Sequence, residues 1–387
     1  MNNNIPENYK LTEVGVIPVD WEVSILNDLS IKIGSGITPT GGETVYKKDG
    51  RPLVRSQNIG WGRLLLDDIA YIDDETHLTF PNTEIKLKDV FLNISGASIG
   101  RSSYANEKLV GGNVNQHVCI IRTIDKKLQP LFLNLFLLSK NGQKQIDSFQ
   151  SGGNRQGLNI GQIKTFQIPL PKITEQTAIA TALTEADALI SGIEKLIAKK
   201  RDIKHGAMQK LLSPTEGWSV KKLGDVCISI SSGKSNTNSN NGNYPIYGST
   251  GIIGCKNTFD YEGTKILVAR VGANAGTVNK VFDKYCVSDN TLMITLKPNI
   301  DIDFIFFKLI VFQLNSLVFG SGQPLITGGQ LKNIEIGLPK YEEQTRIATI
   351  LSDMDAEIAV LEKKLEKYRA VKAGMMQNLL TGQIRLV

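Results

Sequence analysis

The sequence predicts an α+β protein in which two α/β domains are separated by two long helices that form an antiparallel coiled coil. The main observation is a repeat: residues 168–213 return without a gap as residues 336–381, and about half of the aligned residues are identical. Each copy follows a longer, dissimilar segment that is broken by Gly, Asn and Asp into short apolar stretches. This order predicts internal two-fold pseudosymmetry.

The limits of the repeat divide the chain into four parts. Residues 1–170 and 214–337 are the two predicted domains, and residues 171–213 and 338–387 are the two helical segments. A chain of 387 residues has room for about two to three domains that each bury a core.

Each copy of the repeat has the composition of one long helix. No proline occurs between Glu175 and Leu212, and Ala, Leu, Ile, Glu, Lys and Gln dominate. Pro171 stands just before this stretch and Pro214 just after it, while Pro339 and Gly382 bound the second copy.

Apolar residues in both copies step by four and three, which is the spacing of a coiled-coil seam. Since each seam needs a partner and the chain supplies two, the economical arrangement pairs the two helices with each other. The alternative is that each helix packs on its own neighbouring domain. The predicted seam residues are Ile179, Leu183, Ile190, Ile193 and Ile197 in the first copy, and Ile347, Leu351, Ile358, Leu361 and Leu365 in the second.

The last part of each helix carries further apolar residues beside the seam: Met208 and Leu212, and Met376 and Leu380. These side chains are candidates for docking another protein subunit. Contact with the chain's own domains explains them equally well.

Basic residues gather in the middle of both helices. A phosphate backbone could run beside them, but such residues commonly form ion pairs along one helix, and Glu194, Asp202, Glu362 and Glu366 are placed for that role. The basic residues are Lys195, Lys199, Lys200, Arg201 and Lys204, then Lys363, Lys364, Lys367, Arg369 and Lys372.

The two variable segments share landmarks in the same order. Both open with a tryptophan, Trp21 and Trp218, and both contain a strand that leads into a Gly-Ala-x-x-Gly turn, at residues 90–100 and 266–276. Both place a Gly-Gln pair just before the repeat. The duplication therefore covers the whole chain, with the globular parts diverged and the helices retained. Strands are expected at 90–94, 118–124, 265–271 and 292–296, and shorter helices at 131–139 and 304–315.

Loops in both variable segments mix Arg, Asn, Gln, Ser and aromatic residues, which suit the edges of DNA bases. For any one of these residues an ordinary solvent-facing role is the alternative. The first segment supplies Ser35, Thr38, Arg55, Gln57, Asn58, Trp61, Arg63, Ser98, Arg101, Asn154 and Arg155. The second supplies Lys234, Asn236, Tyr244, Tyr247, Ser249, Thr250, Arg270, Asn274 and Asn290.

No catalytic or metal-binding constellation is visible in the sequence. The Gly-Ala-x-x-Gly turns match neither GxGxxG nor GxxxxGK[ST], so they are expected to be turns and not nucleotide sites. Asp73, Asp74 and Glu84 only superficially resemble a nuclease metal cluster. The three histidines are isolated from one another and from any nucleophile pattern.

Composition agrees with a globular protein that can bind nucleic acid but does not demonstrate it. The net charge is +6, yet no segment forms a basic arm. No apolar run reaches the roughly 18 residues of a membrane span, and the start lacks the pattern of a signal peptide. A cytoplasmic protein is therefore expected. The four cysteines form no CxxC pair and are expected to be buried thiols.

These features together resemble the DNA specificity subunits of type I restriction-modification systems. The resemblance covers nearly the full length and is carried by the two LPK-x-x-EQ-T-x-IA-T motifs, at 170–181 and 338–349, and their MQ-x-LL tails, at 208–212 and 376–380. In that family each variable segment is a target recognition domain. The repeats pack as an antiparallel coiled coil that holds the two domains in inverted orientation.

The resemblance implies a non-catalytic subunit that reads a bipartite, asymmetric DNA site through the major groove, with helix length setting the spacer. Two methylation subunits would bring S-adenosylmethionine and the catalytic motifs, and restriction subunits would add ATP- and Mg²⁺-dependent translocation and cleavage. This chain itself is expected to hold no cofactor and no metal. A coiled-coil adaptor that binds proteins instead of DNA is the alternative.

Overall fold

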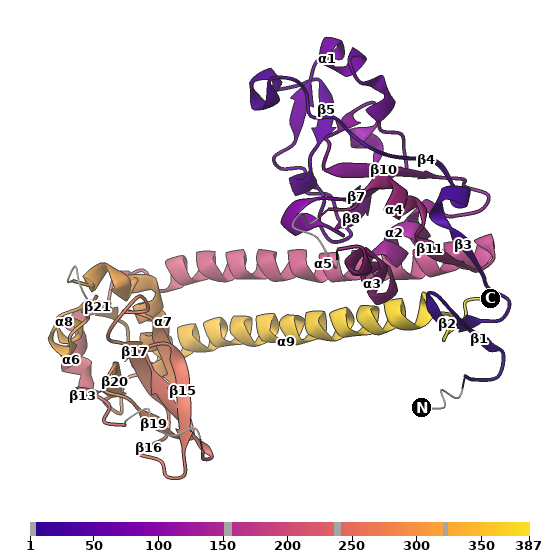
Figure 1. Ribbon diagram of the computed structural model, residues 1–387. Helices are drawn as coiled ribbons and strands as arrows, with labels where there is room; N and C mark the ends of the chain where they lie inside the picture. The colour runs from indigo at the N-terminus through magenta and orange to yellow at the C-terminus, as the bar shows by residue number, and fades with distance from the viewer. Residues whose placement is uncertain (1–4, 151–156, 236–240, 320–323) are drawn as a thin grey trace. The chain divides into compact units, whose positions relative to one another are not determined.

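The computed structural model describes residues 5–150, 157–235, 241–319 and 324–387 (Figure 1). The chain forms two compact units, which we call unit 1 (residues 1–192 and 365–387) and unit 2 (residues 193–364). Each unit contains one variable segment and part of both long helices, because helices α5 and α9 each continue from one unit into the other.

Unit 1 is built on a four-stranded antiparallel sheet of order β4-β10-β7-β8, with smaller sheets β6-β5-β9, β11-β3 and β1-β2 around it. Its strands are β1 (Tyr9–Thr12), β2 (Gly15–Pro18), β3 (Glu22–Ile25), β4 (Ser30–Ser35), β5 (Arg51–Val54), β6 (Ala70–Ile72), β7 (Val90–Asn93), β8 (Ser102–Tyr104), β9 (Asn113–Val114), β10 (Val118–Thr123) and β11 (Gln167–Leu170). Its helices are α1 (Asp74–Leu78), α2 (Pro130–Leu138), α3 (Lys140–Ser148), α4 (Ile160–Lys164) and the first part of α5 (Ile173–Leu211).

Unit 2 is built on the four-stranded antiparallel sheet β13-β20-β17-β18, with sheets β15-β14-β19-β16 and β12-β21. Its strands are β12 (Ser219–Lys222), β13 (Cys227–Ser232), β14 (Tyr244–Gly248), β15 (Gly251–Lys256), β16 (Tyr261–Glu262), β17 (Lys265–Ala269), β18 (Val278–Val281), β19 (Lys284–Val287), β20 (Thr291–Leu296) and β21 (Glu335–Leu338). Its helices are α6 (Leu223–Val226), α7 (Ile302–Phe312), α8 (Gly328–Lys332) and the first part of α9 (Tyr341–Leu379).

The two units share one topology. The main sheets follow the same order, and the smaller sheets agree in direction: β5 pairs antiparallel with β6 and parallel with β9, as β14 does with β15 and β19. The duplication therefore extends through the variable segments, as the shared landmarks predict. The strands and shorter helices expected from the sequence are confirmed as β7, β10, β17, β20, α2 and α7.

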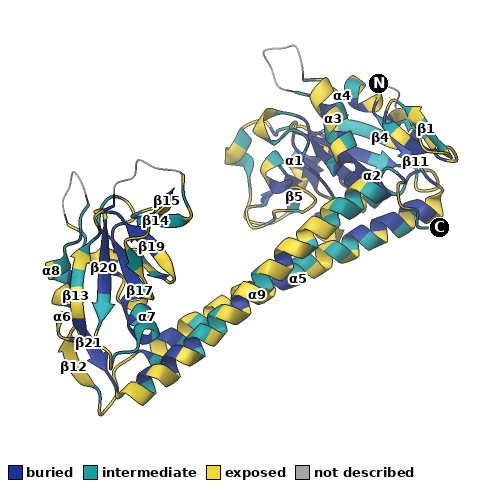
Figure 2. Ribbon diagram, turned by 90° about the horizontal axis from the view of Figure 1, so that it is seen from below, coloured by how far each residue is buried: buried dark blue, intermediate teal, exposed yellow. Residues whose placement is uncertain are grey.

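A buried apolar core lies under the central strands of each unit, which Figure 2 shows as buried. In unit 1 the core gathers Trp21, Phe132 and Phe136 against the sheet. In unit 2 Phe304 and Phe307 of α7 take the same role. Cys119, Cys227 and Cys286 are buried as expected, whereas Cys255 is only half-buried.

A buried glutamine joins each long helix to its unit and explains the EQ of the repeated motif. The side chain of Gln176 is 1% exposed; its Oε1 accepts from the Gln129 amide at 2.9 Å and its Nε2 donates to the Pro171 carbonyl at 2.9 Å. Gln344 makes the same two bonds, with the Asp301 amide and the Pro339 carbonyl. Both helix starts are thus anchored identically.

The glutamine of each Gly-Gln pair also has the same structural role in both units. Gln162 and Gln330 each stand at the third position of a short helix and complete a capping box with the residue before that helix, Asn159 or Thr327. The glutamine satisfies an amide that the helix start would leave unpaired.

The long helices lie side by side in each unit and run antiparallel (Figures 1 and 2). In unit 1, Lys372 of α9 contacts Asp187 of α5 at 2.5 Å, and Leu379 packs in the same core as Leu183. Residue numbers rise in α9 as they fall in α5, which is the predicted direction. In unit 2, Arg201 pairs with Glu362.

Most predicted seam residues are buried between or beneath these helices. The first residues of each seam, Ile179 and Leu183 in α5 and Ile347 and Leu351 in α9, pack into the core of their own unit. Both alternatives from the sequence therefore occur. Each helix packs on its own domain near its first residues and on the other helix farther along. The buried seam residues are Ile179, Leu183, Ile193, Ile197, Ile347, Leu351, Ile358 and Leu365, and Ile190 and Leu361 are half-buried.

Four basic residues of the mid-helix clusters, Lys200, Arg201, Lys204 and Lys372, pair with carboxylates of the other long helix. In unit 2, Lys200 contacts Glu357 at 2.6 Å and Lys204 contacts Asp355 at 2.5 Å. For these side chains the expectation of ion pairs within one helix is wrong, because the antiparallel neighbour brings carboxylates closer.

The candidate docking residues belong to the chain's own cores. Met208 and Leu212 are buried in the core of unit 2, Leu380 is buried in that of unit 1, and Met376 packs against it. For the buried Met208, Leu212 and Leu380 the docking interpretation is wrong and the alternative holds, whereas docking by the half-buried Met376 stays a prediction. Each of these helix ends packs in one core with the first seam residues of the other helix and with the domain beside it.

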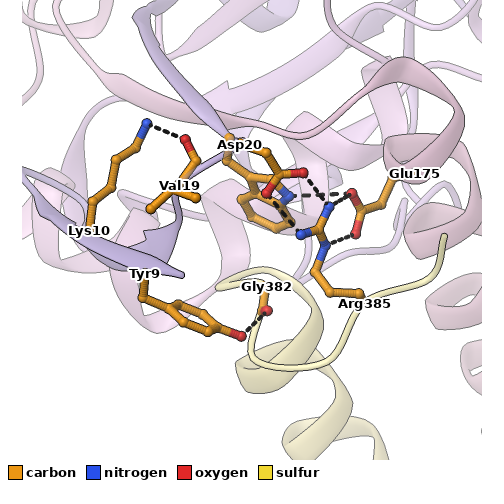
Figure 3. A network of polar contacts seen from close by, with 8 residues as sticks. Tyr9, Lys10, Val19, Asp20, Glu175, Gly382 and Arg385 are labelled. Atoms are coloured by element: carbon orange, nitrogen blue, oxygen red, sulfur yellow. Dashed lines mark hydrogen bonds and ion pairs between the residues drawn. The ribbon is translucent and has the colours of Figure 1, made fainter. Parts of the chain in front are cut away.

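A polar network in unit 1 joins the segment after α9 to the segment before β3 (Figure 3). Arg385 forms paired hydrogen bonds with Glu175, at 2.6 and 2.8 Å, and with Asp20, at 2.9 and 2.8 Å. The indole nitrogen of Trp21 donates to Glu175 at 3.3 Å. Tyr9 adds a hydrogen bond from its hydroxyl to the Gly382 carbonyl.

Candidate nucleic-acid interface

A hollow of about 460 Å³ opens in unit 1 where three loops meet. The loop after β5 forms a short 3-10 helix at Ser56–Asn58, the loop after β7 forms another at Gly96–Ser98, and the loop before β10 supplies His117. Asn93 ties the first loop to β7, because its side-chain amide donates to the Ser56 carbonyl at 2.8 Å. The hollow is lined by Ser56, Gln57, Ser95, Gly96, Ala97, Ser98, Arg101 and His117; we call it the unit 1 hollow.

The unit 1 hollow presents hydrogen-bonding groups of several kinds. Ser95 Oγ and His117 Nδ1 are joined by a hydrogen bond of 2.5 Å, and Gln57 donates to Asp68 at 2.6 Å. Among the residues that the structure describes, none accepts a hydrogen bond or ion pair from the half-buried guanidinium of Arg101. Within the described part of the chain its donors are therefore available to a ligand. Of the predicted residues, the fold brings Gln57, Ser98 and Arg101 together here.

Two other predicted residues of this region have structural roles. Asn58 is 1% exposed and its side chain bonds the Arg55 amide and the carbonyls of Leu65 and Asp68. It cannot reach a base without breaking these bonds, so its assignment to base contact is wrong. The Arg55 guanidinium donates to the Asp68 carbonyl at 3.0 Å and lies over the ring of Tyr46.

The remaining described candidates of unit 1 lie apart from the unit 1 hollow. Arg63 lines a separate hollow with Leu65, Tyr104 and Asn106. The side chain of Trp61 is 57% exposed. Ser35 ends β4 and is exposed, and Thr38 follows it, half-buried. Asn154 and Arg155 lie outside the described residues, as does Asn236 of the second segment.

The candidates of unit 2 divide into packed and exposed side chains. Tyr244 packs edge-on against Phe259, with ring centroids 5.3 Å apart, and Tyr247 against Tyr285. Ser249 and Arg270 are half-buried. The exposed candidates are Lys234, Thr250, Asn274 and Asn290.

Sequence reasoning missed His117 and its neighbour Ser95. His117 had no recognisable partner in the sequence, because Ser95 comes from a different loop and the two meet only across the sheet. Aligning β10 with β20 along the duplication would have pointed to this position.

The described part of the chain shows no metal-binding group and no membrane-spanning helix, and two of its buried cysteines are not activated. Within residues 5–150, 157–235, 241–319 and 324–387, no group of three or more His, Cys, Asp or Glu side chains could hold a metal ion. Nor is any helix among them long and apolar enough to span a membrane. Burial raises the pKa of the Cys119 thiol to about 12 and that of Cys227 to about 11, so neither is an activated nucleophile.

Comparison with known proteins places the duplicated architecture in a family. The family model described as the type I restriction modification DNA specificity domain matches residues 18–201 and again residues 215–368. The chain belongs to this family. Its two matches correspond to the two copies of the duplication, each made of one variable segment and most of one long helix.

Two of the similar proteins align with nearly the whole chain and a third aligns with about half of it. The MjaX type I restriction enzyme specificity subunit of Methanocaldococcus jannaschii is 28% identical over 98% of this chain and 97% of its own. The EcoBI specificity subunit of Escherichia coli is 29% identical over 49% of this chain and 39% of its own. The solved S subunit of M. genitalium has the same fold, with a TM-score of 0.64 at 17% identity, over 98% of this chain and 97% of its own.

Membership accounts for the absence of a catalytic pattern in the sequence. A specificity subunit is the non-catalytic component that gives a type I restriction-modification system its DNA sequence specificity. Catalysis belongs to other subunits.

Proposed function

We propose that this specificity subunit recognises a bipartite, asymmetric DNA site, with the variable domain of each unit reading one half through the major groove. The observation that carries the proposal is that one scaffold occurs twice with different exposed side chains over its loops. Base identity is recognised by side-chain donors and acceptors. Two domains that recognise different base sequences on the same scaffold therefore need different polar side chains.

Within the complex, we propose that the chain directs two methylation subunits, one for each copy of the duplication, and restriction subunits that translocate and cleave DNA. S-adenosylmethionine, ATP and Mg²⁺ would bind to those partners. The support is the family membership together with the duplication, since the family model matches the chain twice.

Mapping methylated adenines in a genome where this subunit works with its methylation subunits tests the proposal. The expected result is one motif made of two different half-sites at a fixed spacing. The half-sites should differ because the loops at residues 51–63 and 235–250 are unrelated in sequence. A single palindromic motif would contradict the asymmetry.

A non-catalytic adaptor that binds proteins is the second candidate, favoured by the diffuse charge of the chain. Titration with salt separates the two. Contacts to DNA phosphates should make duplex binding fall steeply between about 50 and 200 mM salt. Failure to bind any duplex, with methylation subunits present, would favour the adaptor.

A further inference from the structure

The turn after β7 and the turn after β17 are closed by the same main-chain hydrogen bonds. The amide of the last residue of β7 or β17 donates to the carbonyl eight residues later, and the amide of that later residue donates to the carbonyl three residues before it. These paired bonds are Asn93 to the Arg101 carbonyl with Ala269 to the Thr277 carbonyl, and Arg101 to the Ser98 carbonyl with Thr277 to the Asn274 carbonyl. Arg101 is therefore the structural counterpart of Thr277, and Ser98 that of Asn274.

A third loop position matches in the same way. The amide of Ile94 donates to the His117 carbonyl at 3.0 Å, and the amide of Arg270 donates to the Asn290 carbonyl at 3.0 Å. His117 and Asn290 are therefore counterparts. The turn itself is retained because Gly96, Gly100, Gly272 and Gly276 all have positive φ, which side chains rarely adopt.

The side chains at these counterpart positions differ while the backbone beneath them does not. In unit 1, Ser98, Arg101 and His117 line the unit 1 hollow. In unit 2, Asn274, Thr277 and Asn290 are exposed. The core pair Leu92 and Val268, one residue before these turns, is apolar in both units. The polar side chains that line the unit 1 hollow thus differ from their exposed counterparts in unit 2, which indicates that they meet something that differs between the two units.

We propose that these counterpart residues read DNA bases, and that each pair of counterparts contacts the same position in its own half-site. Arg101 and Thr277 then contact corresponding base pairs of the two half-sites, and His117 and Asn290 contact a second corresponding pair. This inference rests on the proposed function and names the residues that carry it. The Arg101 guanidinium has no partner among the described residues and reads guanine, whose O6 and N7 accept from a guanidinium in a bidentate manner. Asn290 reads adenine, whose N6 and N7 match a carboxamide.

Reciprocal exchange tests the register. The variants Arg101→Thr and Thr277→Arg are made in the full chain and assembled with its methylation subunits. Methylation of a duplex library with randomised half-sites is then sequenced. Arg101→Thr should lose the preference for guanine at one position of its half-site, by about tenfold to a hundredfold. Thr277→Arg should gain a guanine preference at the corresponding position of the other half-site.

Two further variants serve as controls. Arg101→Lys keeps the charge but loses the bidentate fork, so it should lose guanine preference while retaining affinity. Thr165→Asn exchanges another exposed counterpart pair, Thr165 and Asn333, outside the unit 1 hollow, and should leave both half-sites unchanged.

Uniformly weaker methylation of all sequences by Arg101→Thr would assign Arg101 to a phosphate and overturn its reading role. A Thr277→Arg protein with an unaltered second half-site would overturn the shared register. If the unaltered protein directs no bipartite methylation, the proposed function falls as well; an intact motif that neither exchange changes overturns this inference alone.

Discussion

At the scale of single residues, the clearest departure from the duplication is the network around Glu175. Its carboxylate is 2% exposed and is satisfied by Arg385 and the Trp21 indole. The repeat counterpart, Glu343, makes only a loose contact of 3.7 Å with Arg346, and the indole nitrogen of Trp218 is buried with no hydrogen-bond partner among the described residues. Unit 1 thus depends on an ion pair that the described part of unit 2 lacks.

Removing Arg385 should destabilise unit 1. The Arg385→Ala variant leaves the buried Glu175 carboxylate without its cationic partner, which we expect to cost about 3 kcal/mol of unfolding free energy. Urea denaturation followed by circular dichroism measures this loss. Arg346→Ala is the matched control, since Arg346 is exposed and contacts the counterpart glutamate; a change of about 0.5 kcal/mol or less is expected. Equal losses in both variants would contradict the network's role.

The same network predicts a dependence on pH. Hydrogen bonds from Arg385 lower the pKa of Asp20 below its ordinary value of 3.8. A carboxyl whose pKa is lower in the folded state stabilises that state above the unfolded pKa, and the contribution is lost as pH falls through the folded value. The stability difference between wild type and Arg385→Ala should therefore shrink as the pH is lowered from about 6 to about 3. A difference that grows on acidification would contradict this assignment.

At the scale of elements, the glutamine of the EQ motif has the same buried role in both copies of the repeat. Gln176 and Gln344 satisfy main-chain groups at the point where each long helix leaves its domain. Main-chain groups at buried helix starts need such partners, because leaving one unpaired costs desolvation energy.

Truncating either glutamine should loosen one helix start. Gln176→Ala and Gln344→Ala each leave buried main-chain groups unpaired, and we expect a loss of about 2 kcal/mol. Hydrogen exchange reports the site, as faster exchange of the Gln129 amide in the first variant and of the Asp301 amide in the second. Gln209→Ala, on an exposed face of α5, should leave both amides protected. Unchanged exchange in both glutamine variants would contradict the anchoring role.

At the scale of the whole molecule, α5 and α9 are the elements that continue from one unit into the other. We therefore expect helix length to set the spacer between half-sites. Inserting four residues in both helices, near Ala198 and Glu366, adds about 6 Å to each at 1.5 Å per residue. Four residues are close to one helical turn, so the apolar seam keeps its face.

The doubly inserted protein should methylate a motif with unchanged half-sites and a spacer longer by about two base pairs, given about 3.4 Å per step. Methylome sequencing provides both measurements. Insertion into α5 alone is the control, and should impair the protein because it shifts the cross-helix pairs such as Lys204 with Asp355. An unchanged spacer in the double variant would refute this role for the helices.

Much of the fold could be predicted because its signals are local or repeated. Proline boundaries and the four-three spacing predicted α5 and α9, and the Gly-Ala-x-x-Gly turns predicted β7 and β17. The candidate site was predicted less well. Asn58 has the residue type of a base reader but satisfies its own loop, and His117 became part of a site only through Ser95. Residue type alone does not distinguish these roles.

The sequence by itself determined the duplication, the long helices and the family. Each of these follows from residues that are close along the chain or that repeat at a fixed interval. The tertiary structure decided which polar side chains are engaged and which remain available. Asn58, Gln176 and Glu175 are committed to partners within the chain, whereas Arg101 faces the unit 1 hollow with its donors available. Such choices depend on contacts between distant segments, and these arise only when the chain folds.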